Sequence, residues 1–107
     1  MNKIAFTDNS GRWFDRNSAK KFRPASYTDS QTGQAVCRAT NHPCVWETLY
    51  LTRSGDFVIV RSSDDWPEVE AVEEIEVKDA VKWLITNGHQ EEVKKMDLAS
   101  EEKQLEV

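Results

Sequence analysis

The fold of this 107-residue chain is decided by residues 46–61, which read Trp46-Glu47-Thr48-Leu49-Tyr50-Leu51-Thr52-Arg53-Ser54-Gly55-Asp56-Phe57-Val58-Ile59-Val60-Arg61. Two runs rich in β-branched and aromatic residues flank a turn that contains Gly55, a pattern that predicts an antiparallel hairpin. Ser54-Gly55 is a poor pair for a two-residue type I′ turn, which prefers Asn or Asp before Gly. A three-residue loop with Gly55 in the left-handed position fits better.

The register of this hairpin sets which side chains share a face. The three-residue loop places Leu49, Leu51, Phe57 and Ile59 on one face, and Trp46, Tyr50, Val58 and Val60 on the other. The two-residue loop would exchange the two pairs on the second strand. In either register both faces carry apolar side chains, so we expect the hairpin to be central in a small antiparallel sheet and covered on both sides, at least in part.

Two helices are expected beside this sheet. Residues 77–87 predict an amphipathic helix, because apolar residues recur there with helical spacing at Val77, Ala80, Val81, Leu84 and Ile85. Asn87-Gly88 would end that helix in the left-handed conformation. Asp15 is a suitable cap for a shorter helix at about residues 15–22, before Pro24. Residues 3–7 and 35–40, with an acidic edge strand at 69–75, complete a predicted α+β fold.

Length and apolar content predict a single domain. We expect residues 1–89 to be compact and residues 90–107 to be a charged tail, helical or frayed, because apolar residues become sparse there. No apolar run approaches the roughly 20 residues of a membrane span, and the N-terminus has no hydrophobic signal region. The expected location is the cytoplasm.

The net charge of −5 is distributed unevenly along the chain. Residues 1–61 hold nine bases and five acids, whereas residues 62–107 hold five bases and fourteen acids. The densest acidic stretch runs from Asp64 to Asp79, where Lys78 is the only base among eight acids. Such a field can steer a basic partner, and a solvated surface that keeps the protein soluble is the alternative interpretation.

Three segments carry a resemblance to other proteins. They are Gly11-Arg12-Trp13-Phe14-Asp15, residues 47–59, and Ala80-Val81-Lys82-Trp83-Leu84-Ile85-Thr86-Asn87-Gly88-His89. Together they resemble a group of small, mostly uncharacterised bacterial proteins that are often encoded on plasmids, phages and other mobile elements. The resemblance implies a fold and a genomic setting, and it implies no active site.

The residues capable of catalysis or metal binding form weak patterns. Cys37, His42 and Cys44 have the spacing Cys-x₄-His-x-Cys, which lacks the close cysteine pair typical of zinc sites and leaves a fourth ligand to His89 or a carboxylate. Whether these residues bind a metal stays open. Neither a nucleophile with a base nor a phosphate-binding glycine loop is indicated. We therefore expect no enzymatic activity and no cofactor.

Nucleic-acid binding is the alternative function. Basic residues lie beside aromatic ones near the N-terminus, and such pairs can grip phosphates and stack bases. On a helix, Arg16, Lys20 and Arg23 would share one side, with Arg12 close by. The sequence pI of about 5.0 has the wrong sign for this function.

The favoured interpretation is a protein-binding module with an acidic surface. The residues assigned to partner binding are acids flanking one tryptophan: Asp64, Asp65, Trp66, Glu68, Glu70, Glu73 and Glu74. Carboxylates would steer the partner while Trp66 anchors it. Together with the mobile-element setting, this suggests an anti-CRISPR-like inhibitor of a host complex that handles nucleic acid.

Overall fold

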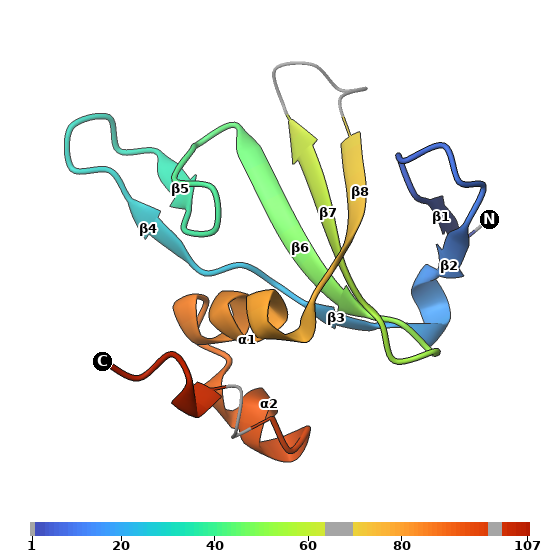
Figure 1. The fold of residues 1–107 in the computed structure, drawn as a ribbon. Coiled ribbons are helices and arrows are strands. Elements are labelled where there is room, and N and C mark those ends of the chain that lie inside the picture. Colours follow the sequence, from blue (N-terminus) through green and yellow to red (C-terminus); the bar gives the residue numbers. More distant parts are fainter. Residues whose placement is uncertain (1, 64–69, 99–101) are drawn as a thin grey trace.

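The computed structural model describes residues 2–63, 70–98 and 102–107, and it confirms the α+β class (Figure 1). The elements in chain order are β1 (Lys3–Ala5), β2 (Trp13–Asp15), β3 (Lys20–Phe22), β4 (Ser26–Thr28), β5 (Ala35–Cys37), β6 (Val45–Leu51), β7 (Phe57–Ser63), β8 (Glu70–Ile75), α1 (Val77–Thr86) and α2 (Gln90–Lys95). One antiparallel sheet has the order β3-β6-β7-β8, while β1–β2 and β4–β5 form separate two-stranded ribbons.

The β6–β7 hairpin occupies the centre of the four-stranded sheet. Gly55 has a φ of +90°, and its N–H donates to the carbonyl of Thr52 over 2.9 Å. The N–H of Thr52 in turn donates to the carbonyl of Asp56 over 2.8 Å. This left-handed position favours glycine, and it brings Leu51 opposite Phe57. The observed register is therefore the one that the three-residue loop predicts.

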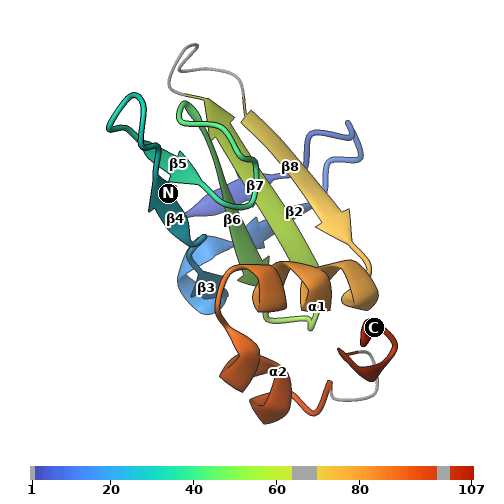
Figure 2. The same cartoon turned by 90° about the vertical axis from the view of Figure 1, so that its left-hand side faces the viewer.

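In Figures 1 and 2, α1 crosses one face of the sheet near the ends of its strands, and α2 lies beside α1. The core on this side joins strand and helix residues: Phe22, Leu49, Phe57, Ala80, Val81, Trp83, Leu84 and Val93. Gly88, with a φ of +81°, follows α1 and donates its N–H to the carbonyl of Ile85. The N–H of His89 bonds the carbonyl of Leu84 at 2.7 Å, which completes a Schellman motif. The helix thus stops where the Asn87-Gly88 pair predicts, with Thr86 as its last residue.

The opposite face of the sheet is covered by the β1–β2 ribbon. Ile4 and Phe14 are the buried residues of these two short strands, and the residues on either side of each are exposed. They pack on Tyr50, Val58 and Val72 of the sheet, and these five residues form a second, smaller core. Both faces of the central hairpin are therefore covered, as its apolar alternation predicts.

The prediction of a short helix at about residues 15–22 is wrong. Asp15 does act as a cap, since its Oδ1 accepts the N–H of Asn17 over 2.9 Å, but only a 3₁₀ turn at Arg16–Ser18 follows. Lys20–Phe22 is a strand that pairs with β6. Pairing satisfies the outer backbone groups of β6 and buries Phe22, which a short polar helix would not achieve. The cover that we expected from this helix is supplied by the β1–β2 ribbon.

The edge strand predicted at residues 69–75 is observed as β8. Its outer side is partly closed by Thr7, whose N–H donates to the carbonyl of Val72 over 3.1 Å. The Thr7 hydroxyl lies 3.1 Å from both the N–H and the carbonyl of Val72. Closing an edge in this way limits pairing with other chains.

Residues 90–107 were predicted as a charged tail that is helical or frayed. Gln90–Lys95 is helical, and Val93 is 0% exposed within the same core as Leu84. Met96, Leu98 and Leu105 pack against that core. The core therefore continues beyond residue 89.

Candidate functional site

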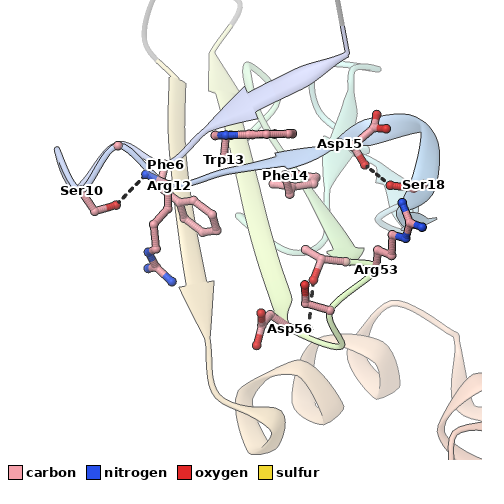
Figure 3. Close-up of a pocket in the computed structure, with 12 residues that line it drawn as sticks. Phe6, Ser10, Arg12, Trp13, Phe14, Asp15, Ser18, Arg53 and Asp56 are labelled. Carbon is pink, nitrogen blue, oxygen red and sulfur yellow. Dashed lines mark hydrogen bonds between the residues drawn. The ribbon is translucent and has the colours of Figure 1, made fainter.

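A hollow of about 600 Å³ lies between the β1–β2 ribbon and the turn that joins β6 to β7 (Figure 3). The residues that shape it come from two distant parts of the sequence: Phe6, Arg12, Phe14 and Asp15 from the N-terminal ribbon, and Arg53 and Asp56 from the turn. Its volume is within the range of about 300–1,000 Å³ that is usual for ligand sites.

The apolar wall of the hollow is made by two phenylalanines. The rings of Phe6 and Phe14 meet edge to face, with centroids 6.2 Å apart, and Phe14 lies against Tyr50 at 5.3 Å. Trp13 extends from the opposite side of β2, away from the turn (Figure 3). It is 53% exposed, and the Nζ atom of Lys3 lies 4.5 Å from its ring centroid. Trp13 thus contributes to the lining of the hollow, while its indole lies on the other side of β2 from Phe14.

Arg12 is a fixed part of this wall. Its guanidinium donates to Glu74 of β8 over 2.9 Å, contacts Asp8 at 3.4 Å, and lies 4.6 Å from the ring centroid of Phe6. The hydrogen bond that Arg12 donates to Glu74, and then the one that it donates to Asp8, raises the pKa of Arg12. Hydrogen bonds from Ser10, with a smaller contribution from Arg12, lower the pKa of Asp8. Arg12 thereby ties the N-terminal ribbon to the edge of the sheet.

The other three charged side chains of the hollow differ in how they are engaged. Asp15 accepts the N–H of Asn17 and so belongs to the local cap. Arg53 and Asp56 are exposed, and within the described residues neither side chain forms an ion pair or a hydrogen bond. The backbone between them is held by the left-handed Gly55 and by a 3.1 Å bond from the Asp56 N–H to the Thr52 hydroxyl.

The predicted acidic surface is described only in part. Asp64, Asp65, Trp66 and Glu68 lie outside the described residues, and Glu70 is the first residue of β8. Glu74 is bonded to Arg12, whereas Glu73 is exposed and forms no ion pair within the described residues. Of the two assigned acids whose side chains the structure describes, Glu73 is thus the one without an ion pair.

The basic residues predicted to bind nucleic acid do not share one side of a helix. Because residues 16–23 do not form a continuous helix, the spacing of Arg16, Lys20 and Arg23 does not place them on one helical side. Arg12 is ion-paired as described, and Lys20 is paired with Glu92. Arg16 and Arg23 are exposed, and their side chains form no ion pair within the part of the chain that the structure describes.

The cysteines and histidines do not gather at the hollow. Cys37 is buried, and the N–H of Cys44 donates to Nδ1 of His42 over 3.0 Å. Nε2 of His89 lies 2.7 Å from the carbonyl of Arg23, and its ring stacks on Trp83. Within the described residues, no three His, Cys, Asp or Glu side chains are grouped closely enough to hold a metal ion.

Sequence reasoning missed the hollow because its lining combines two distant parts of the chain, residues 6–18 and residues 52–56. The sequence pattern places Arg53 in the hairpin turn, Asp56 at the start of the second hairpin strand and Phe6 in the strand predicted at residues 3–7. The signal that could have found them is the pair of opposite charges flanking Ser54-Gly55, which a tight turn must present at the surface.

No protein-family model, curated protein sequence or solved structure matches this chain. The resemblance to mobile-element proteins therefore stays a prediction. Among the described residues, no helix is both long and apolar enough to cross a membrane.

Proposed function

We propose that this protein is a non-enzymatic protein-binding module whose acidic surface, made by acids of the stretch from Asp64 to Asp79, engages a partner with a basic surface. The proposal is carried by an excess of exposed carboxylates where β8 leads into α1. Glu73, Glu76 and Asp79 are exposed there, and none of the three forms an ion pair within the described residues, whereas Lys78 is the one exposed base among them. Unpaired surface charge of one sign steers association with a surface of opposite sign.

The intramolecular ion pairs support this view. Arg12 with Glu74 and Lys20 with Glu92 join the basic half of the sequence to its acidic half. These pairs consume two bases and two acids, so the acidic half keeps its large excess of carboxylates. Such an excess of carboxylates is complementary in charge to the basic channel of a nucleic-acid-binding protein. We therefore propose that the protein inhibits a defence complex that handles nucleic acid.

The absence of enzymatic activity is part of the proposal. It is supported by the two histidines, which both lie away from the hollow. His42 accepts a backbone N–H from Cys44, and His89 is bonded to the carbonyl of Arg23. A general base needs hydrogen-bond reach to a nucleophile or a substrate proton, and one ring nitrogen of each histidine is directed at a backbone group instead.

An affinity pull-down from bacterial lysate, read by mass spectrometry with and without nuclease, tests this function. Wild-type protein should retain a stoichiometric protein partner that survives nuclease. A triple variant carrying Asp64→Lys, Asp65→Lys and Glu73→Lys should lose that partner while keeping its far-UV circular dichroism and Tm.

The matched control places the same change in net charge elsewhere. Glu91→Lys, Glu102→Lys and Glu106→Lys alter three acids of the C-terminal segment and should leave partner retention unchanged. Equal loss of the partner in both triple variants would show that binding depends only on net charge. Full retention in the first triple variant would refute the acidic surface.

Direct nucleic-acid binding is the second candidate, and the outer face of the β1–β2 ribbon favours it. Trp13 is half exposed there beside Lys3, and Arg16 follows directly after β2. An indole with neighbouring cations can stack a base and contact its phosphate. Fluorescence titration with single-stranded DNA should then show quenching that weakens steeply as salt is raised. Recovery of nucleic acid alone in the pull-down would select this candidate.

A further inference from the structure

The hollow beside the β6–β7 turn offers two opposite charges that the fold does not use. Of its four charged side chains, Arg12 is bonded to Glu74 and Asp15 caps a turn. Arg53 and Asp56 remain, exposed and without an ion pair within the described residues. Because they do not pair with each other, each is available to a ligand.

The two available charges are directed to different ends of the hollow. Figure 3 shows Arg53 extending toward Ser18, whereas Asp56 lies on the side of Phe6 and Arg12. The rings of Phe6 and Phe14 lie above the turn, with Phe14 between the ends marked by Arg53 and Asp56 (Figure 3). A ligand that spans the hollow would therefore meet a cation, an apolar surface and an anion in succession.

The backbone that presents these charges is preorganised. Gly55 is held in the left-handed conformation, and Thr52 accepts the Asp56 N–H with its hydroxyl. The opposite wall is held by the bonds of Arg12 and Thr7 to β8. A site whose walls are already fixed loses less conformational entropy when a ligand binds.

We propose that the hollow is a recognition site for a short peptide segment of a protein partner, in which an acidic and a basic side chain flank an apolar one. The acidic side chain pairs with Arg53, the apolar one covers the ring edges of Phe6 and Phe14, and the basic one pairs with Asp56. This inference rests on the proposed protein-binding function and adds to it a second contact region, distinct from the acidic surface at β8 and α1.

The probe for this site is a set of short immobilised peptides centred on Glu-Leu-Lys, Lys-Leu-Glu or the neutral Gln-Leu-Gln, detected with labelled full-length protein. The wild type should prefer one order of charges and bind the neutral peptide about tenfold more weakly, since each exposed ion pair contributes modestly. The swap variant Arg53→Glu with Asp56→Arg keeps the net charge and should reverse the preferred order.

Control variants and a second ligand class complete the test. Lys94→Glu with Glu91→Arg swaps two exposed charges on α2 and should leave the preference of the wild type intact. The inference is overturned by equal binding of both charge orders, by an unchanged preference in the swap variant, or by binding of a free amino-acid mixture in solution without binding of any peptide.

The partner pull-down separates failure of this site from failure of the proposed function. Loss of a captured partner in the swap variant supports the site. A partner that needs Asp64, Asp65 and Glu73 but is retained by the swap variant would refute the hollow and leave the acidic surface standing. Absence of any protein partner would refute both.

Discussion

Glu47 is a buried carboxylate on the helix-covered face of the sheet, and removing it should destabilise the fold strongly. It is 5% exposed. Its Oε1 accepts the indole N–H of Trp83 over 2.8 Å, and its Oε2 accepts Nη2 and Nε of Arg61 over 2.8 and 3.1 Å. The network joins β6, β7 and α1. We therefore expect the substitutions Glu47→Ala and Glu47→Gln to differ sharply in cost.

The magnitude follows from what each substitution leaves behind. Glu47→Ala leaves the buried indole N–H of Trp83 without an acceptor, and an unsatisfied buried donor costs about 1–3 kcal/mol. The side chain of Arg61 is 44% exposed and can return to water, so loss of the ion pair adds at most about 1 kcal/mol. The sum of about 1–4 kcal/mol is a large share of the roughly 5–15 kcal/mol that stabilises a typical domain.

Glu47→Gln separates the two interactions, because its amide oxygen can still accept the indole N–H. It should cost only about 1 kcal/mol, the contribution of the lost charge beside Arg61. A double-mutant cycle with Trp83→Phe isolates the indole bond. In the Glu47→Ala background, Trp83→Phe no longer removes that bond, so we expect a coupling free energy of about 1–2 kcal/mol.

Equilibrium unfolding in urea, followed by far-UV circular dichroism, measures these costs without depending on the fluorescence of Trp83. Glu106→Ala is the control, since that carboxylate is exposed and forms no ion pair within the described residues. It should change the free energy of unfolding by less than about 0.5 kcal/mol. If Glu47→Ala is as mild as this control, the buried network does not stabilise the fold and the reasoning fails.

Three further predictions concern Val93, Gly88 and the ion pair of Lys20 with Glu92. Val93→Ala should lower the free energy of unfolding by about 1–3 kcal/mol, because the side chain is fully buried; a surface-like effect in urea unfolding would exclude α2 from the core. Gly88→Ala should cost about 1 kcal/mol because φ is +81°, and an unchanged Tm would contradict the left-handed cap. A hydrogen bond from Lys20 lowers the pKa of Glu92 below its ordinary value of 4.5, so the stability from this pair is present above that value and is lost as pH falls through the lower folded pKa. Lys20→Met should therefore flatten the fall in Tm on acidification below about pH 4.5, and superimposable Tm profiles would show that the pair does not contribute.

Several features of the candidate site depend on contacts that local patterns do not encode. The bond between Arg12 and Glu74 joins residues 62 positions apart, and the hollow unites Phe14 with Arg53. Side chains at such separations meet only once the strand order and the register are set. The sequence could name exposed acids and bases, whereas which of them neutralise each other followed from the fold.

By itself, the sequence determined the central hairpin, its register preference, and the position and end of α1. Each is a local property: alternation over a few residues, a glycine that tolerates positive φ, or apolar spacing along one helical face. Tertiary structure alone decided that Lys20–Phe22 is a strand, that the β1–β2 ribbon covers the second face, and that Glu47 is buried. The physical reason is that pairing with β6 and burial of Phe22 stabilise that segment more than the local cap signal of Asp15, whose helix would have been short and polar.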